Sequence, residues 1–222
     1  MAFPLLLAIP AALGILALRT HHLGFKMGEP VACALLLVGL RFRFGSPRAD
    51  YVIAALLWSA IGDFFLATRS GHAAFFVYGI AAFFMAHLGY LAFALKNGRL
   101  DGLALIVLLF LYFPFFWFYL RPALKDSVLL AAVLAYLLVS CVSLAAAAGL
   151  RLRPPAKALY LAGIGLIVVS DTLIALSEFL RYRAGNGLIL PTYYLAHLCV
   201  TLALFCCWPW GQRPVSTPGR AA

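Results

Sequence analysis

The sequence predicts an all-α, polytopic membrane protein of about eight transmembrane helices. Of its 222 residues, 65% are hydrophobic and only 11% are charged, whereas a soluble domain is about half apolar and about a quarter charged. Apolar runs recur along the whole chain, and most approach the ~20 residues that a helix needs to cross a bilayer. Little of the chain is left for a soluble domain, so we expect residues 1–210 to form a single transmembrane domain.

The predicted spans follow the apolar runs in order. They lie at residues 2–18, 29–43, 51–68, 72–95, 101–119, 127–149, 156–180 and 189–210. The first is as long as a signal peptide, but it lacks a basic start and a small-x-small cleavage site, so we expect it to be retained. The second is the shortest and ends in the basic stretch "RFRF". Residues 211–222, "GQRPVSTPGRAA", are predicted to be a short disordered tail.

The fifth span contains the stretch "LYFPFFWFYL". Pro114 has no backbone N–H and removes a helix hydrogen bond, which predicts a kink. The aromatic residues around it are typical of a belt at the membrane interface. The alternative is that they wall a groove for a lipid tail.

The net charge of +10 comes from Lys and Arg in short loops such as "RFRFGSPR", "KNGR", "RLRPPAK" and "RYR". This is the usual pattern for the loops of membrane proteins, and we expect no nucleic-acid partner because no folded basic domain is present. With the N-terminus inside, ten of the 17 Lys and Arg residues fall on the inner side and seven on the outer side. The bias predicts that both termini are cytoplasmic. The five Cys residues lie in or near apolar segments without a CxxC pair, so we expect free buried thiols.

The two halves of the chain resemble each other. "GDFFLA" in the third span matches "SDTLIA" in the seventh, and "MAHLGYLAF" in the fourth span matches "LAHLCVTLALF" in the eighth. The matches predict two four-helix repeats in parallel orientation, a plan known among membrane proteins. The alternative is chance, because short matches arise readily in a chain rich in Ala and Leu.

Acidic residues inside the spans are the strongest pointer to function. Asp63, Asp171 and Glu178 lie within apolar segments, and Glu178 is close enough to a span end to reach the interface. A charged Asp at mid-membrane costs a few kcal/mol, so such residues normally face a protein interior or a water-filled cavity and mark a functional site. The alternative is a structural polar contact that holds helices together.

Helical spacing places polar side chains on one face of each of four spans. The candidate site residues are the catalytic pair Asp63 and Asp171, with Ser59, Tyr78, Phe83, His87, Tyr90, Ser170, Tyr194 and His197 as binding or supporting residues. Ser59, for example, is one turn before Asp63, and His87 is one turn after Phe83. Together the four faces predict a buried polar centre. Two close carboxyl groups in a medium of low dielectric do not both ionise easily, so we expect one to hold a proton and the pair to supply an acid and a base.

A metal site is the competing interpretation. His72, His87 and His197 together with an Asp have the side chains that zinc prefers. No HxxxH or HExxH motif sets two ligands on one helical face, and His72 is close to a loop. We therefore expect no metal and no other cofactor.

The ordered set of motifs resembles the YhhN family of membrane proteins, which includes the lysoplasmalogenases. The resemblance is carried by "LLWSAIGDFFLA", "FVYGIAAFFMAHLGYLAF", "GIGLIVVSDTLIAL" and "PTYYLAHLCVTLALF", and with the eight-span plan it covers nearly the whole chain. Many relatives are expected to have Gln at the position of His197. The resemblance implies a hydrolase that cleaves the vinyl-ether bond of a lysophospholipid taken from the membrane, releasing a fatty aldehyde and glycerophosphoethanolamine or glycerophosphocholine.

The resemblance also implies that Asp63 and Asp171 are the catalytic aspartates, which fits the chemistry of the bond. A vinyl ether is cleaved by protonation of an alkene carbon, which creates an oxocarbenium ion. One carboxylic acid would supply the proton, and a neighbouring carboxylate would stabilise the cation and activate water. Two alternatives are a membrane transporter or lipid-handling protein with the Asp pair in its substrate pathway, and a metal-dependent hydrolase of the alkaline-ceramidase type.

Overall fold

The computed structural model describes residues 3–45 and 48–207, and helices account for nearly all of these residues. In chain order they are α1 (Phe3–Leu6), α2 (Ala8–Thr20), α3 (Leu23–Phe44), α4 (Ala49–Thr68), α5 (Ala73–Lys96), α6 (Gly102–Phe115), the π-helical turn η1 (Phe116–Leu120), α7 (Arg121–Ala123), α8 (Ser127–Ala148), α9 (Pro154–Leu180) and α10 (Asn186–Cys207). Within the described ranges, seven segments are long and apolar enough to cross a membrane. The prediction of an all-α polytopic membrane protein is confirmed.

The first two predicted spans differ from the observed helices. The first is divided into α1 and the 13-residue α2, because Pro10 has no N–H to bond the carbonyl of Leu6. The second begins at Leu23 instead of residue 29, where Nδ1 of His22 accepts a hydrogen bond from the N–H of Gly24 at 3.1 Å. The earlier start adds Lys26 to the helix. The predicted tail and the last three residues of the eighth span lie outside the described residues.

Aromatic residues around Pro114 face both the outer surface and an internal cavity. The helix continues past Pro114 and then widens into the π-helical turn η1, a feature frequent at functional sites. Phe118 is 70% exposed on the outer surface, as expected of an interfacial belt. Tyr112 and Phe115 face inward and line an apolar cavity against α8 and α9.

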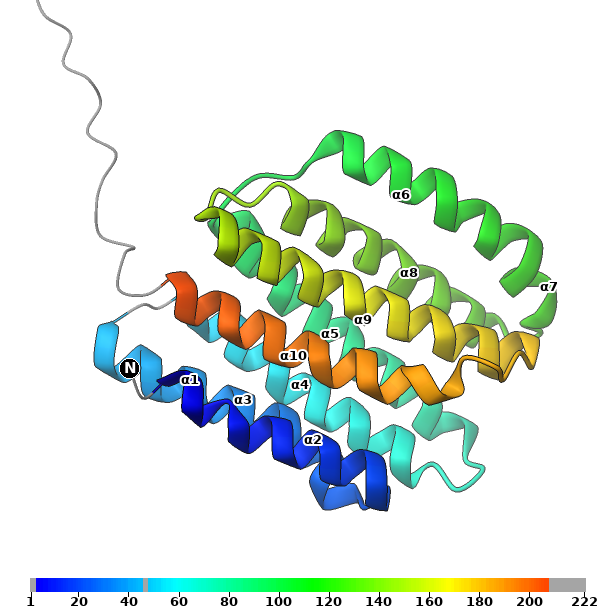
Figure 1. Cartoon of the computed structure of the whole chain (residues 1–222). Coiled ribbons are helices and arrows are strands. Elements are labelled where there is room, and N and C mark those ends of the chain that lie inside the picture. Colours follow the sequence, from blue (N-terminus) through cyan, green and yellow to red (C-terminus); the bar gives the residue numbers. More distant parts are fainter. Residues whose placement is uncertain (1–2, 46–47, 208–222) are drawn as a thin grey trace, which may run out of the picture.

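The long helices run side by side along one direction, with α6 at the edge of the bundle (Figure 1). In each half, successive long helices contact one another: α2–α3–α4–α5 in the first and α6–α8–α9–α10 in the second. Between the halves, α5 contacts α8 and α10 contacts α3. Two parallel halves related by a two-fold axis would make these reciprocal contacts. The duplication of the chain stays a prediction.

Two glycines allow the closest helix pairs to approach. A Cβ atom at Gly89 of α5 would lie 2.6 Å from the carbonyl oxygen of Tyr51 in α4, and one at Gly163 of α9 would lie 2.6 Å from the side chain of Val200 in α10. Small residues at such contacts are typical of packing in membranes, where close van der Waals contact replaces the hydrophobic effect.

The densest packing lies at one end of the bundle. The largest buried cluster includes Leu40 of α3, Val52 of α4, Phe93 of α5, Tyr160 of α9 and Leu204 of α10. These positions are near the C-terminal ends of α3, α5 and α10 and the N-terminal ends of α4 and α9. The opposite end, where α4 and α9 finish, is less tightly filled and holds the polar cavity described next. Among the cysteines, Cys33 and Cys141 are buried, the other three are half-buried, and all five are free thiols.

Candidate active site

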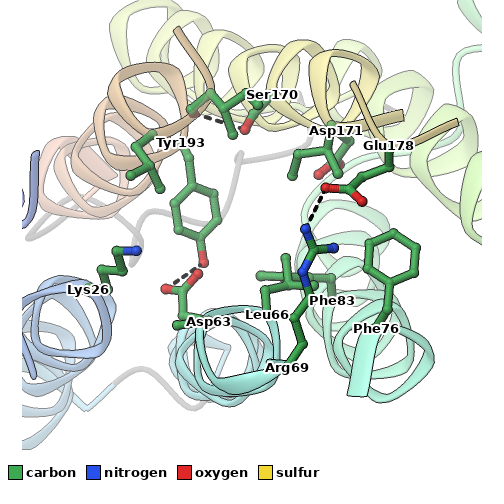
Figure 2. Close-up of a pocket in the computed structure, with 14 residues that line it drawn as sticks. Lys26, Asp63, Leu66, Arg69, Phe76, Phe83, Ser170, Asp171, Glu178 and Tyr193 are labelled. Atoms are coloured by element: carbon green, nitrogen blue, oxygen red, sulfur yellow. Dashed lines mark hydrogen bonds and ion pairs between the residues drawn. The ribbon is translucent and has the colours of Figure 1, made fainter. Parts of the chain in front are cut away.

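A cavity of about 170 Å³ lies between α3, α4, α5, α9 and α10. Both predicted catalytic residues, Asp63 and Asp171, line it from opposite sides (Figure 2). Lys26, Arg69 and Glu178 complete its charged lining, while Phe76 and Phe83 supply apolar walls. The helix ends that surround it place its mouth where α4 and α9 finish.

Asp63 is 8% exposed and faces α10. Its Oδ2 atom accepts a hydrogen bond at 3.2 Å from the hydroxyl of Tyr193, which also donates to the backbone carbonyl of Ser59 at 3.4 Å. One hydroxyl proton is therefore shared between two acceptors. Lys26 points from α3 toward this group in Figure 2.

Asp171 has a different set of partners. Its Oδ2 atom accepts a hydrogen bond from the hydroxyl of Tyr136 at 2.8 Å and lies 3.2 Å from Nε2 of His87. The same nitrogen is 3.3 Å from Oγ of Ser140. A phenol donor and an imidazole nitrogen thus converge on one carboxyl oxygen. Within the described residues no hydrogen bond joins Asp63 to Asp171, so the two acids form separate centres on one cavity.

Two smaller apolar cavities adjoin the polar one. One of about 70 Å³ lies between α4, α5, α8 and α9, and another of about 60 Å³ lies between α6, η1, α8 and α9. Asp171 lines all three cavities. Its carboxyl group therefore lies where a charged chamber meets two hydrocarbon-like chambers.

An ion pair stands at the mouth of the polar cavity. Nη2 of Arg69 lies 2.8 Å from Oε1 of Glu178, and their side chains are 38% and 32% exposed. The hydrogen bond to Glu178 raises the pKa of the Arg69 guanidinium, which lies just beyond the end of α4. The guanidinium carbon is also 5.5 Å from the centre of the Phe76 ring, close enough for a cation–π contact.

Several predicted supporting residues surround the acids. Phe83 lines the cavity and packs edge-on against Tyr193, with ring centres 5.9 Å apart. Ser170 also lines it, but its hydroxyl donates to the backbone carbonyl of Ile189 at 3.0 Å. Tyr90 is buried behind His87, and the buried Ser59 contacts Tyr193 through its backbone carbonyl.

Two predicted tyrosines lie elsewhere. Tyr78 is 51% exposed and packs against Phe65 and Phe75 on the outer face, because nine helical residues turn it by half a circle from His87. Tyr194 is buried against α2, where a Cβ atom at Gly14 would lie 3.5 Å from its ring. Tyr193, one position earlier and about 100° around the helix, is the residue that bonds Asp63. Neither Tyr78 nor Tyr194 is among the residues that line the polar cavity.

His197 also has a partner that the sequence analysis did not identify. Its Nδ1 atom lies 2.8 Å from Oε2 of Glu29, and both side chains are 0% exposed. Glu29 was the first residue of the second predicted span and was not counted among the membrane acids, since the helix was expected to start there. His197 contacts the site indirectly, through its ring packing 4.3 Å from the ring centre of Tyr193.

Tyr136 is the other functional residue that the sequence analysis missed. It is the single aromatic residue of α8, and a phenol among small and aliphatic side chains was the available signal. For the metal alternative, no group of three His, Cys, Asp or Glu side chains within residues 3–45 and 48–207 is placed to hold an ion. His72 is exposed at the start of α5 and packs against Phe75.

The fold and the cavity define a polytopic membrane protein with an ionisable centre between its helices. The YhhN family model matches residues 22–204. Two similar proteins are Lysoplasmalogenase TMEM86A of Bos taurus and of Homo sapiens, which are 32% and 30% identical to this chain over 184 residues. Each alignment covers 78% of this chain and 74% of the relative. The chain belongs to the YhhN family. No solved structure matches it.

Proposed function

We propose that this chain hydrolyses the vinyl-ether bond of lysoplasmalogens, releasing a fatty aldehyde and glycerophosphoethanolamine or glycerophosphocholine. Its family and its similarity to two lysoplasmalogenases make it an enzyme of the lysoplasmalogenase-like type. The observation that carries the proposal is the position of Asp171, where the charged cavity meets two apolar ones. A lysoplasmalogen has the same division, because its vinyl ether joins a polar glycerophosphate to a hydrocarbon chain.

The hydrogen bonds suggest different roles for the two acids. One oxygen of Asp171 accepts a hydrogen bond from Tyr136 and lies beside Nε2 of His87, which is a donor in the Nε2–H tautomer. Two donors on one oxygen suit a carboxylate, which only accepts. Among the described residues, Asp63 accepts a hydrogen bond only from the Tyr193 hydroxyl, which also donates to the carbonyl of Ser59. The ionised form of Asp63 is therefore less stabilised than that of Asp171. We assign the protonated acid to Asp63 and the carboxylate to Asp171.

The proposed reaction consists of protonation, attack by water and breakdown of a hemiacetal. Asp63 gives its proton to the second alkenyl carbon, and the electron pair of the double bond forms the new C–H bond, which leaves an oxocarbenium ion at the first carbon. Asp171 stabilises this cation and removes a proton from the water that attacks it. The hemiacetal hydroxyl then gives its proton to Asp63, and Asp171 passes the proton that it took from water to the ether oxygen. The C–O bond breaks to release the aldehyde and the glycerol hydroxyl, and both acids return to their starting states.

The test measures aldehyde release from alkenyl-glycerophosphoethanolamine by purified protein. Asp63→Asn and Asp171→Asn are each expected to lower the rate about 10²–10⁴-fold, with unchanged gel-filtration behaviour. Asp50→Asn is the matched control, because Asp50 forms an exposed ion pair with Arg41 away from the cavity. An active Asp63→Asn or Asp171→Asn protein would refute the assigned residues. Substrate flux across liposomes without product would instead favour a transporter.

A further inference from the structure

The ion pair at the cavity mouth has the charge arrangement of a zwitterionic headgroup. Arg69 presents a guanidinium and Glu178 a carboxylate, joined by a 2.8 Å contact. A phosphoethanolamine or phosphocholine group carries a phosphate and an ammonium only two carbons apart. When such a headgroup lies across the ion pair, its phosphate contacts the Arg69 guanidinium and its ammonium contacts the Glu178 carboxylate.

We infer that Arg69 and Glu178 determine headgroup specificity, Arg69 by binding the phosphate and Glu178 by binding the ammonium of a zwitterionic lysophospholipid. The inference rests on the proposed function for the identity of the reacting bond. It adds two residues that select the substrate without touching the vinyl ether.

The geometry at the mouth supports binding by these two side chains. Both line the same cavity as Asp63 and Asp171, but on the side where α4 and α9 end. A guanidinium has five N–H donors and binds phosphate through two parallel hydrogen bonds. One contact to Glu178 leaves that capacity largely intact.

The energetic cost of engaging the pair is low. Both side chains are about one-third exposed, and an exposed ion pair contributes little to stability. A ligand that satisfies each charge can therefore replace or bridge their contact. The guanidinium carbon of Arg69 lies 5.5 Å from the centre of the Phe76 ring. This contact holds the side chain near the mouth before a ligand arrives, so binding removes less conformational freedom.

The alternative role for the pair is a latch between α4 and α9. The two residues are 109 positions apart and join the C-terminal ends of these helices. A latch would affect every substrate equally, whereas headgroup recognition would depend on which charges the substrate carries. Substrates that differ only in the charges of the headgroup can therefore distinguish a latch from headgroup recognition.

The experiment compares kcat/KM for an alkenyl chain attached to glycerophosphoethanolamine, to glycerophosphate and to glycerol. Arg69→Gln should lower kcat/KM about tenfold for the two phosphate-bearing substrates and less than twofold for alkenylglycerol. Glu178→Gln should lower the preference for glycerophosphoethanolamine over glycerophosphate several-fold. Arg183→Gln, which removes an exposed arginine at the same end of the bundle, should change none of these ratios.

A charge exchange distinguishes recognition from a latch. Arg69→Glu combined with Glu178→Arg keeps an ion pair but reverses its order. The inference expects the exchanged protein to stay impaired on the zwitterionic substrate, and restored activity on it would overturn the inference. Equal losses on all three substrates for Arg69→Gln would also overturn it.

Binding of non-hydrolysable ligands keeps this inference separate from the proposed reaction. Saturated 1-O-alkyl ethers with the same three headgroups are bound to wild-type protein and to the variants, and the affinities are compared. If wild-type protein releases no aldehyde but shows the expected headgroup ratios in binding, the proposed reaction fails and the inference stands. If aldehyde is released and the ratios do not move with Arg69 and Glu178, the inference fails alone.

Discussion

Nδ1 of His197 lies 2.8 Å from Oε2 of Glu29, although the two residues are 168 positions apart and both are fully buried. Cys33 adds its thiol, with Sγ 3.6 Å from Oε1 of Glu29. The pair fastens α3 to α10 beside the ring of Tyr193. It therefore supports the side chain that holds Asp63.

Removing one member of this pair should destabilise the protein. Glu29→Leu leaves a buried imidazole nitrogen without its partner, which costs about 1–3 kcal/mol for a neutral hydrogen bond and about 3–5 kcal/mol for an ion pair. Combining it with His197→Leu should restore most of the loss, since replacing both buried partners by apolar residues is often neutral.

Thermal unfolding in detergent measures both effects. Asp50→Ala is the control, because the Arg41–Asp50 pair has side chains 39% and 46% exposed and should contribute at most about 1 kcal/mol. A Glu29→Leu protein as stable as wild type would contradict the supporting role.

The separate roles of the two acids predict opposite pH dependence of chemical rescue. In Asp63→Ala the missing group is an acid, so added formate should restore aldehyde release more strongly as the pH falls and formic acid forms. In Asp171→Ala the missing group is a carboxylate, so the restoration should grow as the pH rises. Blanks without protein correct for acid hydrolysis of the vinyl ether. The assignment is wrong if both variants respond in the same direction.

A methyl group at position 62 should disturb the cavity without unfolding the helix. A Cβ atom on Gly62 would come within 2.6 Å of the Phe83 ring, and that ring walls both the polar cavity and an apolar one. Gly62→Ala should lower aldehyde release about tenfold, while helix propensity itself favours Ala by up to about 1 kcal/mol.

Gly39→Ala is the matched control, because in the part of the chain that the structure describes the added Cβ on α3 would have no atom within 4 Å apart from its chain neighbours and its own helix backbone. It should leave both activity and thermal stability unchanged or slightly raised. Equal activity of the two variants would show that Phe83 does not shape the substrate path.

Filling the apolar cavities should change the preference for chain length. Ala175 lines both of them, so Ala175→Leu reduces the space beside Asp171. The ratio of kcat/KM for long to short alkenyl chains should fall several-fold, and thermal stability reports any overpacking, which costs about 1–3 kcal/mol. Leu103→Phe on the exposed face of α6 is the control, since Leu103 is 73% exposed. An unchanged ratio would show that the alkenyl chain of the substrate does not occupy these two cavities.

The sequence was informative where the signal is local. The two aspartates and His87 could be identified because a charge or imidazole in an apolar helix is costly unless it faces the interior. Phe83 could be identified because it lies one helical turn before His87. Glu29 was missed because the polar stretch around Lys26 hid the start of α3, whose N-terminus depends on the His22 cap. Spacing alone allows either Tyr193 or Tyr194 on the face of His197, because adjacent positions differ by only about 100° around the helix. The structure places Tyr193 against Asp63.

The sequence by itself determined the membrane class, the approximate spans, the YhhN resemblance and the presence of buried acids, since composition and helical period are properties of single segments. Only the tertiary structure decided that Asp63 contacts Tyr193, that Asp171 contacts Tyr136 and His87, and that Asp171 lines all three cavities. These relationships depend on how far each helix is rotated and shifted against its neighbours. The packing of whole helices sets those two quantities, and spacing within one helix does not contain them.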